Sequence, residues 1–220
     1  TAKALDSAID ILIEKPSEAT LNAAKSAWIE ARVPYQQTEV YRFGNAIVDD
    51  WEGRVNAWPL DEGLIDYVDS SYGSERDENS LYSVNVIANT SLTVNGKTVD
   101  ASVITPTLLS DTLHEAEEVE ANVATGYHAI EFLLWGQDFN TDGPGNRPFT
   151  DYTTAANADR RKEFLKITVN LLIENLQSLV NEWAPEEENY RDSFVNSKPK
   201  ESFQKILLGM TLLAGFELAG

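Results

Sequence analysis

Two side chains near the middle of the chain have types and a spacing suited to metal chemistry. His128 and Glu131 lie three residues apart in 126–138 (GYHAIEFLLWGQD). On an α-helix they share a face, with Cβ atoms about 5–6 Å apart. Helical bundles build carboxylate-bridged metal sites from Glu and His at this spacing, there in the reverse order. Because the surrounding stretch is apolar, a bound cation would offset the burial of this pair. A core histidine hydrogen-bonded to Glu131 or to backbone remains the alternative.

Few other donors are available to such a site. The chain has no cysteine and one other histidine, His114. If one helix carries both histidines, they are about 21 Å apart at 1.5 Å per residue, so they cannot hold the same ion. We expect His114, next to three glutamates, to be a solvated surface residue. The remaining ligands are then carboxylates, carbonyls, water or a residue outside this chain, which favours iron, manganese or calcium-like ligation, or a mixed His/carboxylate zinc site.

A second group of polar and aromatic residues is expected on one helix. Ser17 is a plausible N-cap for a helix over 17–48, in which Pro34 predicts a kink. At 100° per residue, one sector of about 80° holds Trp28, Arg32, Tyr35, Glu39 and Arg42. Glu39 and Arg42 are the best carboxylate and cation to complete a site at His128. An ordinary Arg–Glu pair bracing two helices is the alternative.

Two smaller features add to the candidate site. Asp61 and Glu62 follow a packed loop at Trp58-Pro59, and either acid could reach the site. Gly126, just before the His–Glu pair, could let another backbone approach closely or mark a kink.

The remaining periodicities predict an all-α antiparallel bundle with one small β-hairpin excursion. Helices are expected over 3–14, 62–68, 79–88, 107–135, 155–183 and 186–195, followed by an apolar, buried one within 206–220. The hairpin is expected over 91–101, where an alternating pattern is centred on Asn95-Gly96.

Composition excludes several classes of function. With 17 basic and 36 acidic residues the net charge is −19, so no basic surface is available for nucleic acid or for anionic lipid. No run approaches the roughly 20 apolar residues of a membrane span. The sequence contains no G-x-S-x-G elbow, Walker loop, G-x-G-x-x-G or H-E-x-x-H.

The sequence G-Y-H-A-I-E at 126–131 resembles the GxHxxE motif of the imelysin-like family, also classed as peptidase M75, and of its iron-regulated protein A-like members. The likeness extends through 131–138 (EFLLWGQD) and to 28–43, 55–68 and 158–165. It implies an imelysin-type fold of two helical bundles in an exported protein of the periplasm or cell envelope. It also implies a role in iron uptake, with His128 and Glu131 in the site and Glu39 and Arg42 in the matching second-helix motif. On this basis 1–200 is expected to form the N-terminal bundle, and 201–220 the start of a second bundle that is mostly missing from this chain.

Three functions compete at this point. The first is iron handling without catalysis, with an iron ion or iron chelate, or less favourably zinc or another divalent metal, as ligand, and other envelope iron-uptake proteins as partners. The second is an M75-type metallopeptidase, although a catalytic zinc needs three protein ligands and only two are visible. The third is an adhesion or scaffold module in which the His–Glu pair is structural.

Overall fold

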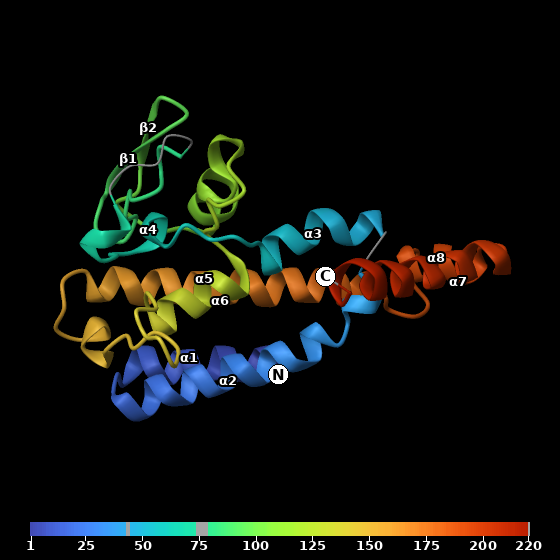
Figure 1. Cartoon of the computed structure of the whole chain (residues 1–220), viewed down its shortest axis with the longest axis horizontal. Coiled ribbons are helices and arrows are strands. Elements are labelled where there is room, and N and C mark those ends of the chain that lie inside the picture. Colours follow the sequence, from blue (N-terminus) through green and yellow to red (C-terminus); the bar gives the residue numbers. More distant parts are fainter. Residues whose placement is uncertain (43–44, 74–78, 220) are drawn as a thin grey trace.

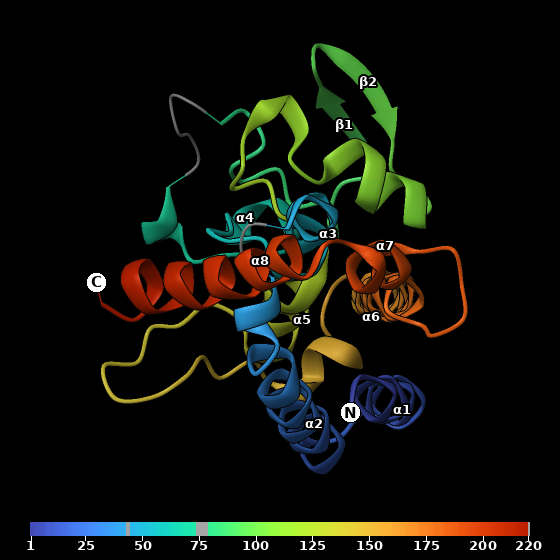
Figure 2. The same ribbon diagram turned by 90° about the vertical axis from the view of Figure 1, so that its right-hand side faces the viewer.

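Four helices form the centre of the molecule. The structure, a computed structural model, describes residues 1–42, 45–73 and 79–219. They are α1 (Ala2–Glu14), α2 (Glu18–Gln36), α5 (Gly126–Trp135) and α6 (Ala158–Glu182). In Figure 1, α6 runs lengthwise through the molecule, with α5 against it and α1 and α2 below. Viewed along α6, the four helices surround a common interior (Figure 2). The predicted helical class, with one hairpin, is confirmed.

The core is built from the apolar stripes of these helices. Leu5, Ile9 and Leu12 of α1 recur at helical spacing and are fully buried. They are joined by buried residues of α5 and α6, among them Ile130, Leu133, Phe164, Leu165 and Val169. Ser17 caps α2 as predicted, because its hydroxyl accepts the Thr20 amide while Thr20 Oγ1 accepts the amide of Ser17.

The expected helix over 17–48 is wrong at its C-terminal end. α2 ends at Gln36, where the amide and hydroxyl of Thr38 both donate to the Tyr35 carbonyl and close the last turn. A 3-10 turn (Glu39–Tyr41) and α3 (Ala46–Asn56) follow. Residues 43 and 44, which the expected helix also covers, lie outside the described residues.

The excursion between α3 and α5 contains little α-helix. It consists of α4 (Glu62–Ile65), a 3-10 turn (Ser70–Tyr72), β1 (Ser91–Val94), β2 (Lys97–Asp100), a π-helical segment (Leu108–Leu113) and a turn (Ala116–Glu118). The hairpin is confirmed, with Leu92 opposite Val99 and both Asn95 and Gly96 at positive φ, as a two-residue I′ turn requires.

Two expected helices in this excursion are wrong. Residues 79–88 form turns because the amides of Asn85, Val86 and Ile87 bond to carbonyls of residues 63–65 rather than within a helix. The expected helical stretch over 107–135 does have a break before Gly126, where the sequence suggested one and where α5 begins, but its first part is not a continuous helix because three glutamates (Glu115, Glu117 and Glu118) adopt positive φ.

One arginine fastens the excursion to the bundle. The guanidinium of Arg160, on α6, donates to five main-chain carbonyls, those of Val86, Ile87, Asn89, Ala101 and Ser102. The two ends of the segment that carries the hairpin are therefore held at a single point of α6.

The C-terminal part lies at one end of the bundle (Figure 1). After α6 come α7 (Tyr190–Asn196), α8 (Pro199–Leu212) and a π-helical segment (Leu213–Glu217). The expectation that the final apolar helix is buried is wrong, since Ile206, Leu207, Leu208 and Met210 are each about half exposed. Among the described residues, no helix has both the length and the apolar character that crossing a bilayer requires.

Candidate functional site

The predicted His–Glu pair forms on the first two turns of α5. His128 Nδ1 lies 2.9 Å from Glu131 Oε2, and the two side chains are 17% and 42% exposed. The ring of Trp58 packs against the imidazole with the centroids 4.9 Å apart. A carboxylate that accepts from Nδ1–H fixes the tautomer in which Nε2 carries the lone pair. Both side chains are partly exposed, and in this tautomer Nε2 is the imidazole nitrogen able to accept a ligand.

The mixed face of α2 packs beside this pair, as the angular spacing predicts. Trp28 Nε1 donates to the Tyr127 carbonyl at 3.0 Å, and the two rings meet edge to face. The guanidinium of Arg32 lies 5.0–5.7 Å from the ring centroids of Trp28, Tyr35 and Tyr127. Burial lowers the pKa of Arg32, although the charge of Glu131 acts in the opposite direction. Arg32 therefore interacts with the charge of Glu131.

Glu39 and Arg42 belong to a neighbouring cluster. Arg42 Nη2 lies 3.5 Å from Glu39 Oε1, and Nη1 donates to Tyr35 Oη at 2.8 Å and forms a close ion pair with Glu52. Arg42 is buried. Among the side chains that the structure describes, no three His, Asp or Glu groups lie close enough together to hold a metal ion. In this conformation Glu39 is thus engaged by Arg42.

The two acids after the Trp58 loop differ in their surroundings. Asp61 is buried and accepts a 2.7 Å hydrogen bond from Asn79 Nδ2. Burial raises the pKa of Glu62, the charge of Arg147 opposes this, and the charges of Asp138 and Glu131 raise it further. Glu62 is thus coupled electrostatically to Glu131 of the pair.

The start of α5 is locked onto the end of α3. Gly126 has φ +84°, and a Cβ there would lie 2.6 Å from the Val55 carbonyl oxygen. The close backbone approach suggested by the glycine is therefore confirmed. Thr125 Oγ1 donates to the Arg54 carbonyl at 3.2 Å, which adds a second link between the same two segments.

His114 takes part in this lock, so its prediction as a solvated residue is wrong. Its side chain is 6% exposed, with Nε2 2.9 Å from the Gly53 carbonyl and Nδ1 accepting the Ala124 amide at 3.4 Å. Burial lowers its pKa. The three adjacent glutamates suggested an exposed position for His114. The chain turns sharply at these glutamates, however, and the imidazole is buried against Gly53.

The most deeply buried charges were not anticipated. Asp66 receives Nε and Nη2 of Arg161 at 2.6 and 2.9 Å and Nη1 of Arg147 at 2.7 Å. Arg147 also donates to Asp151 at 2.8 Å, and Tyr67 Oη donates to the same carboxylate at 2.6 Å. Burial opposes ionisation of Asp66, but the hydrogen bond from Arg161 and the two positive charges outweigh it and lower its pKa. Its partners lie 81 and 95 residues away, so no local pattern reveals them.

The fold and site therefore define a mostly helical bundle with a partly buried histidine, hydrogen-bonded to a glutamate, on a short central helix. The imelysin (peptidase M75) family model matches residues 1–219, and the chain belongs to this family.

Two relatives extend the comparison. The chain is 38% identical over 64 residues to iron-regulated protein A of Synechococcus elongatus, a match that covers 29% of this chain and 18% of that protein. A crystal structure from Parabacteroides distasonis ATCC 8503, of a protein that carries the name iron-regulated protein A precursor, has a TM-score of 0.54 and 22% identity. This match covers 98% of the present chain and 45% of that one, so the chain spans less than half the length of either relative.

Proposed function

We propose that this protein binds iron, as an ion or a chelate, in the periplasm or cell envelope, as part of iron uptake. The observation that supports the proposal is the 2.9 Å contact between His128 Nδ1 and Glu131. If Nδ1–H donates to the carboxylate, the lone pair of Nε2 is available for a ligand. Metal-binding histidines usually have their other nitrogen held by a carboxylate or carbonyl in this way. The names of the two relatives supply the link to iron.

The donors of the proposed site are nitrogen and carboxylate oxygen. His128 would bind through Nε2, with Glu131 either orienting it or turning to bind the ion itself. Glu62, whose pKa the charge of Glu131 raises, is a further candidate carboxylate, and Glu39 would have to release Arg42 to bind the ion. Such a set suits iron, and zinc or another divalent ion less well. The few side-chain donors leave positions for water or for the oxygens of a chelator.

Metal content of the purified protein tests this proposal. After exposure to Fe²⁺ or Fe³⁺, we expect stoichiometric iron in the wild type, its loss in His128→Ala, and a roughly 10- to 100-fold weaker affinity in Glu131→Gln. Glu18→Gln, on the exposed start of α2, is the matched control and should bind as the wild type does. Equal iron in His128→Ala and wild type, with a lower melting temperature in the variant, would instead identify the pair as structural.

A peptidase activity is the alternative implied by the family's second name. A catalytic zinc takes three protein ligands and one open position. Among the described residues, no third His, Asp or Glu joins His128 and Glu131 in a group that could hold a metal ion. Binding therefore fits the donor set better than hydrolysis does, and chelator-sensitive cleavage of unfolded protein substrates would reverse that order.

A further inference from the structure

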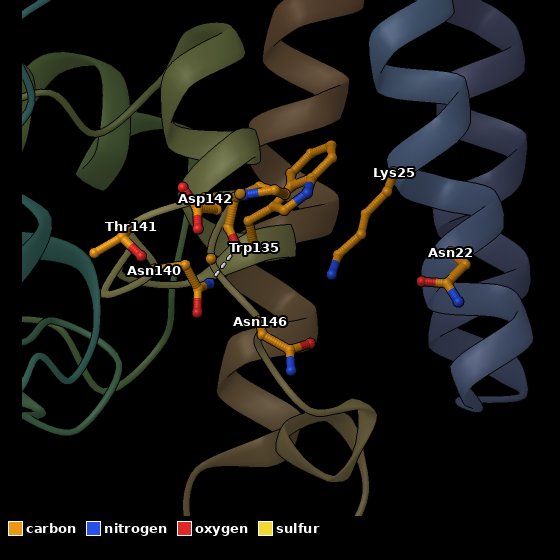
Figure 3. Close-up of a pocket in the computed structure, with 10 residues that line it drawn as sticks. Asn22, Lys25, Trp135, Asn140, Thr141, Asp142 and Asn146 are labelled. Carbon is orange, nitrogen blue, oxygen red and sulfur yellow. Dashed lines mark hydrogen bonds between the residues drawn. The ribbon is translucent and has the colours of Figure 1, made fainter.

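A pocket of about 560 Å³ lies at the C-terminal end of α5 (Figure 3). One wall is α2, through Asn22 and Lys25, and the other is the loop over 140–146. The indole of Trp135 lies between the two walls. The volume falls within the roughly 300–1,000 Å³ typical of small-molecule sites.

The loop wall is held in place by main-chain contacts. Gly136, at φ +69°, ends α5, and the Arg147 amide returns to the Trp135 carbonyl at 2.8 Å. A Cβ on Gly145 would lie 2.7 Å from the carbonyl oxygens of Trp135 and Gly136, so only glycine allows this approach. Asn140 Nδ2 donates to the Pro144 carbonyl at 2.6 Å and closes the tip. The pocket is therefore a built feature of the fold.

Lys25 supplies the charge in this pocket. Its ammonium lies 5.5 Å from the Trp135 ring centroid and, in Figure 3, points into the space between the walls. In the part of the chain that the structure describes, no carboxylate forms an ion pair with it, although acidic residues outnumber basic ones 36 to 17. Burial, and then the charge of Arg147, lower the pKa of Lys25. Asp142 also lines the pocket, but it is exposed to solvent. Among the described residues, this half-buried cation thus has no carboxylate partner where it faces the pocket.

We propose that this pocket binds a small hydroxylated carboxylate, with the carboxylate on Lys25. An ammonium and a carboxylate form a charge-assisted hydrogen bond that gains strength where water is partly excluded. The amides of Asn22 and Asn146 offer donors and acceptors to hydroxyl groups, and the indole packs against the carbon skeleton. An inorganic anion would satisfy Lys25 but leave these groups unused. The site shares no residue with the proposed metal site and does not depend on it.

Isothermal titration in metal-free buffer at pH 7 tests the pocket with three probes: malate, sulfate and glucose. We expect malate to bind with a stoichiometry of one, more tightly than either of the others. Lys25→Gln should weaken malate at least about tenfold, the effect of losing one charge-assisted hydrogen bond. Lys25→Arg keeps the charge and should retain most of the affinity. Lys3→Gln, on exposed α1, is the matched control and should behave as the wild type does.

Several results would overturn the proposal. They are the absence of heat with malate, sulfate binding as tightly as malate, and glucose binding that is insensitive to Lys25→Gln. Melting curves establish that the variants fold; if Lys25→Gln does not, Asn146→Ala on the exposed loop takes its place and should also weaken malate. His128→Ala separates the two sites, because it should remove iron and leave malate affinity unchanged. Loss of malate in His128→Ala would show that the anion binds at the His–Glu pair instead.

Discussion

Replacement of Asp66 by Asn probes the buried charge network that connects α4, α6 and the loop after α5. The Asp66 carboxylate accepts three hydrogen bonds from two guanidinium groups, and the side chains of Asp66, Arg147 and Arg161 are at most 2% exposed. The substitution preserves shape but removes the negative charge. Arg147 then retains the Asp151 carboxylate, whereas Arg161 retains only main-chain carbonyls.

The size of the effect follows from this geometry. Loss of one partner from a buried ion pair destabilises proteins by about 3–5 kcal/mol. Arg147 keeps Asp151 at 2.8 Å and Arg161 keeps the Asp151 carbonyl at 2.7 Å, so the lower end, about 3 kcal/mol, is expected. For a chain of this size each kcal/mol lowers the melting temperature by roughly 2–4 °C, which gives a decrease of about 6–12 °C.

Thermal unfolding at pH 7 measures this decrease, with Asp10→Asn as the control. Asp10 forms an exposed pair with Lys166, which also has Asp6, so its loss should cost at most about 1 kcal/mol. Because folding lowers the pKa of Asp66, the ionised carboxylate stabilises the folded protein above the ordinary aspartate pKa of about 3.9. This stabilisation disappears as the pH falls through the lower pKa of Asp66 in the folded state. The difference between wild type and Asp66→Asn should therefore shrink below about pH 4. Equal melting temperatures for Asp66→Asn and Asp10→Asn at pH 7 would refute the reasoning.

Three further changes test how α5 and the excursion are held. Gly126→Ala should lower the free energy of unfolding in urea by about 2–5 kcal/mol, because Gly126 has a left-handed φ and a Cβ there would meet the Val55 carbonyl. Gly143→Ala, with open space around it, should change this free energy by at most about 0.5 kcal/mol. Similar losses in both variants would contradict this reasoning. Because burial lowers the pKa of His114, its contribution to folding stability is present above the unfolded-state pKa of about 6.5 and is lost as the pH falls through the lower folded-state pKa. The melting temperature should therefore fall more between pH 7 and pH 5 in the wild type than in His114→Gln. Parallel curves of melting temperature against pH would exclude this contribution. Arg160→Met should lower the free energy of unfolding by about 2–4 kcal/mol and accelerate amide hydrogen exchange over 86–102, with Arg160→Lys intermediate. Unchanged exchange over these residues would show that the hydrogen bonds of the Arg160 clamp, the five that its guanidinium donates to main-chain carbonyls, are dispensable.

Local patterns predicted the parts of this fold that depend on local physics. The periodicities of α1 and α6, the Ser17 cap and the Asn95-Gly96 turn each follow from a few neighbouring residues. The contact between His128 and Glu131 is of the same kind, because helical spacing alone brings the two side chains together.

The remaining parts depend on partners that are distant in sequence. The end of α2 at Gln36 moved Glu39 and Arg42 off the helix whose spacing placed them beside Trp28 and Arg32. The buried positions of His114 and Asp66 are set by Gly53, Arg147 and Arg161, which lie 61 to 95 residues away. Whether Glu39 joins His128 and Glu131 around a metal stays a prediction.

The Arg160 clamp has a consequence for how this chain can diverge. All five of its acceptors are main-chain carbonyls, which every amino acid carries. The attachment therefore does not depend on which side chains these five residues carry. Substitutions along the hairpin can accumulate without detaching it, provided that the backbone path is kept and the arginine is retained. The excursion is consequently a place where related chains can acquire new surfaces while the central helices, and the histidine they carry, stay where they are.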